Sequence, residues 1–480
     1  MRKFTLLIAS LFITIGAMAQ TFVEPEVGKF YKIKGDHETN HWVAVTTAGS
    51  SVAMSSSEES AAVFFKTENG FQEVTTKNYL GYTGGKFTFS STALTVELRN
   101  TGEQANSEGK YAIVSGGNYM YNNSTDGIAH ESTAWLNIPR LWGFVEVEYD
   151  DAYNGKIFRL TTYSGNNFDK YLYQKIDGTT DLYYNGTTDN TQAYWKFEMV
   201  TMGAYKIKNV HTGLYIDVLT GNNDFVNMSE AAPGQYEVVT QVGNETSGNG
   251  KYYIKKVGVN CSLHSTDGSG KVKGWEGGGL GNQYIFTEVD EFSHTLNVTD
   301  AGWATIVLGF NAIIPDGVTA YTIASQEDGY VTLKEVTGVL QANVPVLVNA
   351  PQGNYGFVYT TEAATVTESG LQGTLYNKNI AADAYVLGIP EGETEVCFAK
   401  AKLTDGSFLN NANKAYFVPT SGQANAASYS FRFGEGTTGI NEVKGENGNV
   451  KAIFDLTGRR VENISAPGIY IVNGKKVLVK

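Results

Sequence analysis

The chain has 480 residues, of which 42% are hydrophobic and 18% are charged, so its composition is that of a folded protein with about three domains. It carries 36 Lys and Arg against 49 Asp and Glu, and the net charge of −13 argues against nucleic acid or an anionic lipid surface as a partner. The 54 Gly, 9 Pro, 29 Tyr and 24 Phe favour many short strands joined by tight turns, and we therefore predict an all-β protein. Two cysteines, Cys261 and Cys397, are too few for a disulfide scaffold, a Cys-rich zinc module or an iron–sulfur site.

Residues 1–19 have the order of a secretory signal peptide. Two basic residues precede an apolar run over residues 5–17, and Ala17 and Ala19 supply the small residues of a cleavage site. The apolar run is shorter than the roughly 20 residues that a membrane-spanning helix needs. We predict cleavage after Ala19, export of the mature chain, and no transmembrane segment.

A repeat of roughly 45 residues occurs six times after the signal peptide. Each repeat opens with a glycine, which is followed by an aromatic or apolar pair, an alternating strand and then a second short strand. The opening glycines are Gly28, Gly70, Gly109, Gly155, Gly203 and Gly250. One repeat cannot bury its apolar face alone, whereas three repeats around a pseudo-threefold axis close a barrel without open edges. We predict two such barrels, over residues 25–148 and 153–290, and an ordinary β-sandwich is the alternative.

The six-repeat pattern resembles tandem β-trefoil domains of the ricin-B or fascin kind. The stretch GLYIDV at residues 213–218 is similar to the segment of ricin-type lectin repeats in which an aspartate accepts hydrogen bonds from sugar hydroxyls. The resemblance implies that Asp217 is a sugar ligand, and a solvated aspartate at a strand end is the alternative. A Q-x-W sequence closes the family's repeat, and only Gln235 with Tyr236 and the looser QAYW at residues 192–195 approach it here.

Trp275 is a second candidate contact for a ligand. It lies in the stretch KGWEGGG at residues 273–279, which is too polar and flexible to need a large apolar side chain for packing. Sugar sites combine hydrogen-bonding groups with an aromatic face on which the C–H side of the ring can lie. Trp275 is therefore either a stacking platform or a tryptophan that caps the open end of a barrel.

Residues 37–41 read HETNH and match H-E-x-x-H, in which two histidines bind zinc and the glutamate is a general base. That chemistry requires a helix, but the flanks alternate with period two, and His211 in the corresponding repeat lacks the other two residues. We therefore predict a turn and no metal site. Nucleophile elbow, phosphate loop, dinucleotide fingerprint and EF-hand sequences are also missing, so we predict no cofactor and no catalytic residue.

The repeat stops after residue 290, and residues 291–434 show a different strand alternation that is typical of a β-sandwich. Pro345 cannot donate a hydrogen bond to a strand ladder, so we expect the strand that contains it to be an edge strand. Residues 300–321 resemble a module that is common near the C-termini of surface proteins from Bacteroidota. This part is predicted to be a spacer without chemistry of its own.

Residues 435–480 are predicted to form a polar linker and a small C-terminal β domain. DLTGRRV at residues 455–461, GIYIV at 468–472 and a basic last strand resemble the C-terminal sorting domain of the type IX secretion pathway. The resemblance implies contact with the type IX secretion machinery, passage through the periplasm and a location outside the cell or on the outer-membrane surface. A plain pair of terminal hairpins is the alternative.

The sequence therefore favours an exported, non-catalytic protein with lectin-like carbohydrate binding and a glycan or glycoprotein as its partner. The candidate ligand-binding residues are Asp217, Trp275, Gln235 and Tyr236. The alternatives are a protein-binding adhesin, a protease inhibitor that presents an exposed loop, a purely structural surface component and, least favoured, a zinc metalloprotease that uses residues 37–41. Since one fold hosts many functions, the choice between them depends on the site.

Overall fold

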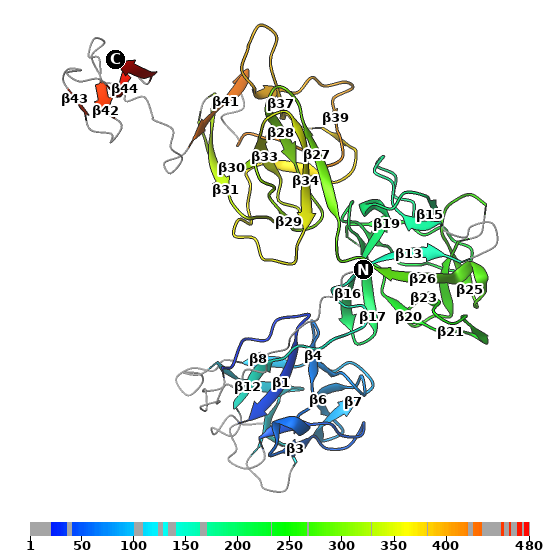
Figure 1. Cartoon of the computed structure of the whole chain (residues 1–480). Coiled ribbons are helices and arrows are strands. Elements are labelled where there is room, and N and C mark those ends of the chain that lie inside the picture. Colours follow the sequence, from blue (N-terminus) through cyan, green and yellow to red (C-terminus); the bar gives the residue numbers. More distant parts are fainter. Residues whose placement is uncertain are drawn as a thin grey trace, which may run out of the picture. The chain divides into compact units, whose positions relative to one another are not determined.

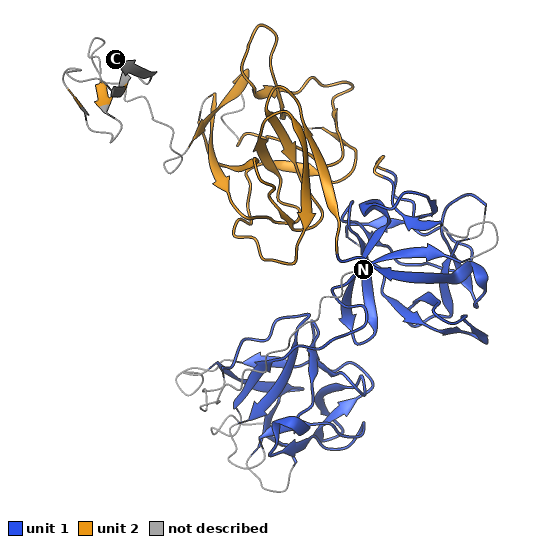
Figure 2. Cartoon of the chain, viewed as in Figure 1, with its two compact units in different colours: residues 1–175, 179–290 blue, residues 176–178, 291–480 orange. Residues whose placement is uncertain are grey.

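The computed structural model describes residues 21–479 apart from several gaps. The residues outside the description are 1–20, 36–40, 100–108, 123–127, 133–140, 164–169, 232, 266–267, 328, 382, 421–425, 434–452, 456–459, 462–467, 473–474 and 480. The chain forms two compact units, residues 1–175 with 179–290 and residues 176–178 with 291–480 (Figure 2). The predicted signal peptide lies outside the described residues and stays a prediction.

The first compact unit begins with a 12-stranded sheet whose strands follow one another in three groups of four (Figure 1). The elements are β1 (Phe30–Gly35), β2 (Trp42–Ala44), β3 (Ala53–Ser55), η1 (Glu58–Ser60, a 3-10 helix), β4 (Phe64–Lys66), β5 (Phe71–Glu73), β6 (Tyr79–Thr83), β7 (Lys86–Ser90), β8 (Glu97–Arg99), β9 (Lys110–Ser115), β10 (Asn118–Tyr121), β11 (His130–Ser132) and β12 (Leu141–Glu146). The outer strands of each group pair in the order β8–β9–β12–β1–β4–β5, and the middle strands form the hairpins β2–β3, β6–β7 and β10–β11.

The second 12-stranded sheet repeats this arrangement and closes completely. Its elements are β13 (Ile157–Thr162), β14 (Tyr171–Tyr173), β15 (Tyr183–Gly186), η5 (Thr191–Ala193, 3-10), β16 (Tyr194–Thr201), β17 (Ala204–Asn209), β18 (Tyr215–Ile216), β19 (Met228–Ser229), β20 (Tyr236–Val239), β23 (Tyr252–Lys256), β24 (Cys261–His264), β25 (Lys273–Glu276), η6 (Leu280–Asn282, 3-10) and β26 (Gln283–Glu288), with an inserted hairpin β21 (Gln241–Val242) and β22 (Glu245–Thr246). The ring runs β13–β16–β17–β20–β23–β26 and back to β13, and the hairpins are β14–β15, β18–β19 and β24–β25. The prediction of two tandem β-trefoils in an all-β chain is confirmed.

The backbone at the start of each repeat explains why the sequence has a glycine there. Five of the six have a positive φ, which favours glycine because it has no Cβ. These five are Gly28 (91°), Gly109 (74°), Gly155 (75°), Gly203 (81°) and Gly250 (71°). Gly70 is needed for space instead, because a Cβ there would lie 2.8 Å from the carbonyl oxygen of Leu94.

Each trefoil has an aromatic core with a buried tryptophan on the fourth strand of one repeat, the third repeat in the first trefoil and the first repeat in the second. The indole N–H of Trp142 in β12 donates to the carbonyl of Met120 in β10 at 2.9 Å, and Trp195 in β16 donates to Leu172 in β14 at the same distance. Both indoles are fully buried. Each bond joins the fourth strand of a repeat to its second strand, so the barrel holds its hairpin in the same way in both trefoils.

The second compact unit contains a β-sandwich. Its elements are β27 (Ser293–Val298), β28 (Trp303–Ile306), β29 (Ala312–Ile313), β30 (Thr319–Glu327), β31 (Tyr330–Val336), β32 (Val339–Leu340), β33 (Val346–Asn349), β34 (Gly353–Tyr359), β35 (Gln372–Thr374), β36 (Lys378–Ile380), β37 (Tyr385–Gly388), β38 (Cys397–Lys400), β39 (Phe408–Asn410), β40 (Lys414–Tyr416) and β41 (Ser428–Phe433). One sheet has the order β27–β34–β29–β32 and the other β28–β33–β30–β31–β41–β38–β37. The expectation for Pro345 is wrong, because β33 has neighbours on both sides; Pro345 precedes Val346, its first residue, where no ladder N–H is needed.

Four short strands follow in the C-terminal segment. They are β42 (Ile453–Asp455), β43 (Arg460–Val461), β44 (Gly468–Val472) and β45 (Lys475–Val479), and they pair antiparallel in the order β43–β42–β44–β45. The basic last strand of the sequence is thus an edge strand of this sheet. Within the described part of the chain, no helix has the length and apolar character needed to cross a membrane.

Candidate functional site

The H-E-x-x-H match falls almost entirely outside the described residues, since only His41 is described. The N–H of His41 donates to Ser55 at 3.0 Å, and its carbonyl accepts from Gly35 at 2.7 Å. Strands β1 and β2 on either side of the motif pair antiparallel, with Lys34 opposite Trp42. Residues 37–40 themselves lie outside the described residues, so the turn stays a prediction.

Asp217 follows the last residue of β18 and turns its carboxylate onto its own backbone. Its N–H donates to the carbonyl of Asn227 at 2.9 Å, and its Oδ1 accepts from the N–H of Val218 at 2.6 Å. The side chain is half-buried. One carboxylate oxygen is thus used to shape the turn, and Oδ2 is the oxygen that could accept from a ligand hydroxyl.

Tyr236 is not a surface contact for a ligand, which corrects the expectation for this residue. It is fully buried in the second barrel, and its hydroxyl donates to the backbone carbonyl of Asp217. Burial raises the pKa of Tyr236 above its usual range, so the hydroxyl stays protonated as a donor. Tyr236 therefore positions Asp217, while the neighbouring Gln235 is exposed.

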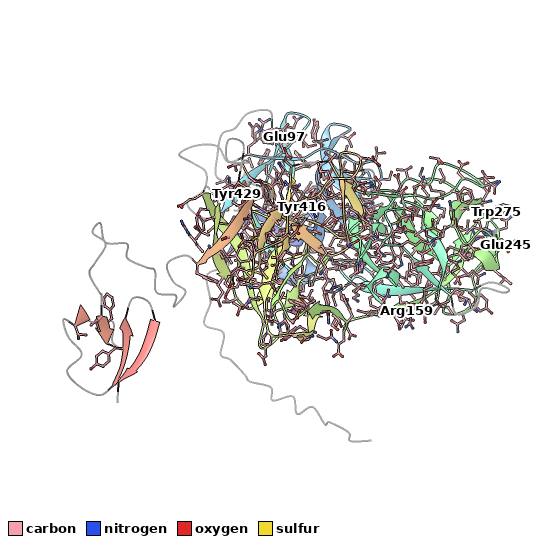
Figure 3. All side chains as sticks on the ribbon, turned by 90° about the horizontal axis from the view of Figure 1, so that it is seen from above. Glu97, Arg159, Glu245, Trp275, Tyr416 and Tyr429 are labelled. Atoms are coloured by element: carbon pink, nitrogen blue, oxygen red, sulfur yellow. The ribbon has the colours of Figure 1, made fainter. Side chains whose placement is uncertain are left out.

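Trp275 is an exposed aromatic side chain on a rigid hairpin, and Figure 3 labels it at the edge of the second trefoil. Its side chain is 42% exposed, and the ring of His264 on the paired strand stacks on it at 5.2 Å between centroids. His264 is held in turn by a 3.0 Å hydrogen bond between its Nδ1 and Asn282 Oδ1. The indole is thus available as a stacking platform.

Asp217 and Trp275 belong to different repeats of the second trefoil. The segment of residues 219–226 lies between them and is fastened to β25, because Asn223 donates to Gly274 at 2.7 Å and Gly274 donates to Asp224 at 2.8 Å. The structure thus places them on two neighbouring hairpins.

A hollow that the sequence did not indicate lies on the first repeat of the second trefoil. It has a cavity volume of about 150 Å³ and is lined by Tyr173, Asn185, Gly186, Thr187, Thr188, Asn190 and Gln192. These residues come from strands β14 and β15, the loop of residues 187–190 and helix η5. The lining offers three carboxamides, two threonine hydroxyls and one tyrosine with its ring and hydroxyl, and none of its residues carries a charge.

One side of the hollow is held by a short hydrogen-bond network around Gln192. Asn190 caps η5, because its Oδ1 accepts from the N–H of Gln192 at 3.0 Å, and this leaves its amide N–H groups as donors. The carbonyl of Gln192 accepts from Gln174 at 3.0 Å and from Asn209 Nδ2 at 2.8 Å. These bonds fix the backbone, so the polar side chains project from a rigid frame.

Asp189 anchors the loop of the hollow from outside the lining. Its Oδ2 is paired with the guanidinium of Arg159 on β13, and its Oδ1 accepts from the hydroxyl of Tyr194 at 2.8 Å. Arg159 also lies over the ring of Tyr171 at 5.0 Å. Burial and the hydrogen bond to Asp189 raise the pKa of Tyr194 to about 12, so Tyr194 stays a donor at neutral pH. We name Arg159, Asp189 and Tyr194 the loop anchor.

The hollow can bind a neutral, hydroxyl-rich molecule by hydrogen bonding and by contact with one aromatic ring. Amides and hydroxyls both donate and accept, which suits sugar hydroxyls, and the site has no nucleophile–base pair and no pair of carboxylates for hydrolysis among its lining residues. The sequence signal that could have found it is QAYW at residues 192–195, which places Gln192 in the lining and Trp195 in the core.

Comparisons with known proteins give no close relative. No family model matches the sequence, and no curated protein matches it. Among solved structures, the designed threefold-symmetric protein ThreeFoil is 16% identical with a TM-score of 0.24, over 28% of this chain and 99% of that one. A Polyporus squamosus lectin bound to a human-type influenza-binding epitope is 15% identical with a TM-score of 0.24, over 30% of this chain and 52% of that one. A Macrolepiota procera ricin B-like lectin in complex with lactose is 13% identical with a TM-score of 0.24, over 29% of this chain and 100% of that one. These scores are too low to support the fold, which follows from the strand pairing.

Proposed function

We propose that this chain is an exported, non-catalytic carbohydrate-binding protein and that the hollow on the first repeat of the second trefoil is its main sugar site. The observation that carries the proposal is the lining of this hollow, in which seven uncharged residues, among them three carboxamides, two hydroxyls and Tyr173, surround about 150 Å³. A small site with convergent polar groups and an aromatic wall is what recognition of a sugar ring requires. The loop anchor holds this arrangement before a ligand arrives, which lowers the entropy lost on binding.

Trp275 and Asp217 are proposed as further contacts. The indole offers an exposed face for the C–H side of a sugar ring, and Asp217 Oδ2 offers an acceptor on the next hairpin. Gln235 is exposed beside Tyr236, so it is kept as a candidate, whereas Tyr236 acts through Asp217. These contacts would extend recognition from one sugar residue to a longer glycan.

A glycan array tests the proposal with the full chain and two matched variants. Thr188→Trp fills the hollow from an exposed position, and Asn244→Trp places the same side chain on the exposed turn between β21 and β22. We expect the parent and Asn244→Trp to bind the same glycans, and Thr188→Trp to lose about tenfold or more in affinity because its indole occupies the space of the ligand. A blank array with well-folded parent protein would refute carbohydrate binding; equal binding by both variants would place it outside the hollow.

We also propose export by the type IX pathway, on the basis of the signal-like segment at residues 1–19 and the tail at residues 453–480. Truncation of the tail should leave the chain in the periplasm of a type IX-competent host, and the intact chain should reach the surface or the medium. Equal secretion of both forms would contradict a sorting role for the tail. Fractionation with antibody detection measures the difference.

A further inference from the structure

The connection between β24 and β25, in the third repeat of the second trefoil, lies against the strand β15 that carries part of the hollow. The N–H of Tyr184 in β15 donates to the carbonyl of Gly270 at 2.9 Å, and the N–H of Gly268 donates to the hydroxyl of Tyr184 at 3.0 Å. Tyr184 is buried, so these two hydrogen bonds hold the connection in place beside Asn185, the next residue of the strand.

The carboxamide of Asn185 lies directly on Gly270. A Cβ placed on Gly270 would be 2.6 Å from Nδ2 of Asn185 and 3.0 Å from its Cγ, so the carboxamide occupies the space that any side chain at residue 270 would need. Gly270 is buried and has a φ of 81°, which favours glycine as well. Since Asn185 lines the hollow, one wall of the hollow rests on a different repeat.

The aromatic ring of the hollow also lies on a glycine. A Cβ placed on Gly186 would be 2.8 Å from Cδ1 of Tyr173, so a side chain there would displace the ring. Tyr173 and Gly186 both line the hollow, whereas Gly270 does not. Gly270 is therefore a support that can be changed without altering the lining itself.

The carboxamide of Asn185 keeps its hydrogen-bonding groups for a ligand. Asn185 is exposed, and its side chain makes no hydrogen bond within the described part of the chain. A carboxamide in one orientation presents a donor and an acceptor side by side. Such a pair fits two neighbouring hydroxyls of a sugar only in the configuration that brings both within reach, so a fixed carboxamide can distinguish epimers.

We propose that the hollow selects a neutral hexose by the configuration of its hydroxyls, and that Gly270 is a positioning residue that sets this selectivity through Asn185. The proposal rests on the proposed function of the hollow as a sugar site. Gly270 provides the space in which the carboxamide lies, and a polar group held in one place discriminates between epimers better than one that can turn toward either. The sugar site of the first repeat is thus completed by the third repeat.

Titration of the full chain with the methyl β-glycosides of glucose, galactose and mannose tests the proposal, because galactose and mannose each differ from glucose at one hydroxyl. We expect the parent to prefer one of the three by at least about tenfold. Gly270→Ala should reduce this preference to about threefold or less, because the new Cβ displaces the carboxamide of Asn185.

Gly268→Ala is the matched control. Gly268 has the same φ of 81°, and nothing lies within 4 Å of the place of its Cβ, so an alanine there carries the same backbone strain without the contact to Asn185. It should keep the parent's preference. Equal losses of preference in Gly268→Ala and Gly270→Ala would overturn the proposal.

A double-mutant cycle separates positioning from a general structural role. Asn185→Ala should lose the preference without any change in the connection between β24 and β25. Gly270→Ala made in that background should change the affinities for the three glycosides by less than about twofold, because the group through which Gly270 acts is gone. A preference retained by Asn185→Ala, or a further loss in the double variant, would contradict the assignment.

The parent chain alone distinguishes failure of this inference from failure of the sugar site. Binding of the three glycosides without preference would overturn the inference and leave the site intact. Binding of a glycan on the array but of none of the three glycosides would overturn it too, because a site that selects a hexose has to bind one. A blank array together with no binding of the glycosides would instead refute the proposed function.

Discussion

The two trefoils of this chain share one strand plan but present different chemistry at corresponding places. The isolated bridges between hairpins involve Ser51, Thr88, Ala53 and Ile128 in the first trefoil, whereas in the second they involve Asp181, Asn227, Tyr183, Lys271, Phe225 and Lys273. The buried tryptophans of the two barrels make the same hydrogen bond at 2.9 Å. The barrels are thus kept alike by packing, while the residues that bridge the hairpins differ between the two trefoils.

The arginine–carboxylate pairs of the two trefoils also combine similar groups with different roles. Each trefoil has an arginine that is paired with a carboxylate and lies over a tyrosine ring, Arg99 with Glu97 in the first and Arg159 with Asp189 in the second (both regions are labelled in Figure 3). Glu97 and Arg99 lie on one strand, β8, so their ion pair ties no loop to the barrel, although Arg99 also donates to the hydroxyl of Tyr119 on β10 at 3.2 Å. Arg159 and Asp189 join β13 to the loop of the hollow. A similar set of groups therefore supports the loop of the proposed sugar site only in the second trefoil.

The largest expected effect tests the buried tryptophan that both barrels have in their cores. Trp142→Ala and Trp195→Ala should each lower the free energy of unfolding of their own trefoil by about 3–5 kcal/mol, because each leaves a cavity and an unpaired carbonyl in the core. Denaturant unfolding with amide hydrogen exchange measures the two barrels separately. A loss in only one trefoil would show that the barrels are not equivalent.

The repeat pattern made the trefoils predictable because their physical requirements are local. A glycine with positive φ before the first strand, as at Gly155 or Gly203, and alternating apolar residues after it recur wherever the chain enters the barrel. The edge-strand expectation for Pro345 was wrong because β33 begins only at Val346, after the proline, and a strand boundary has no comparably strong signal.

The hollow was less predictable because its lining residues come from separate segments that only the folded chain brings together. Tyr173 and Gln192 lie 19 positions apart in the sequence and meet in one hollow only through the pairing of β14 with β15 and the start of η5. Tyr236 looked like a ligand contact by its place after Gln235, but its burial was decided by its position in β20.

An intermediate effect, on glycan affinity, is expected at the loop anchor. It tests whether the pair of Arg159 with Asp189 differs in role from the pair of Arg99 with Glu97. Asp189→Ala should lower the affinity of the hollow for its glycan about tenfold, because the loop that carries Thr188 and Asn190 loses its tie to Arg159 and Tyr194. Since Asp189 is partly exposed, the cost in unfolding free energy should be only about 1 kcal/mol. Titration with a glycan chosen from the array gives the affinity.

Glu97→Ala is the matched control, because it removes the corresponding carboxylate of the first trefoil. It should change neither glycan affinity nor stability by a measurable amount, as expected for an exposed ion pair on one strand. If Asp189→Ala bound the glycan like the parent, the hollow would keep its shape without the anchor. If it lost stability as strongly as Trp195→Ala, the anchor would be part of the core rather than a support of the site.

The smallest expected effect tests whether the two bridging lysines of the second trefoil, Lys271 and Lys273, are needed for its fold. Lys271→Gln/Lys273→Gln should change the unfolding free energy of the second trefoil by no more than about 1 kcal/mol, because the pair of Lys271 with Asp181 is partly exposed and the backbone bridges remain. The same denaturant measurement used for the tryptophans gives this value. A loss near that of Trp195→Ala would mean that the two lysines are needed to cover the ring of Phe225, over which both lie. A small loss would show that the fold of the second trefoil does not need them.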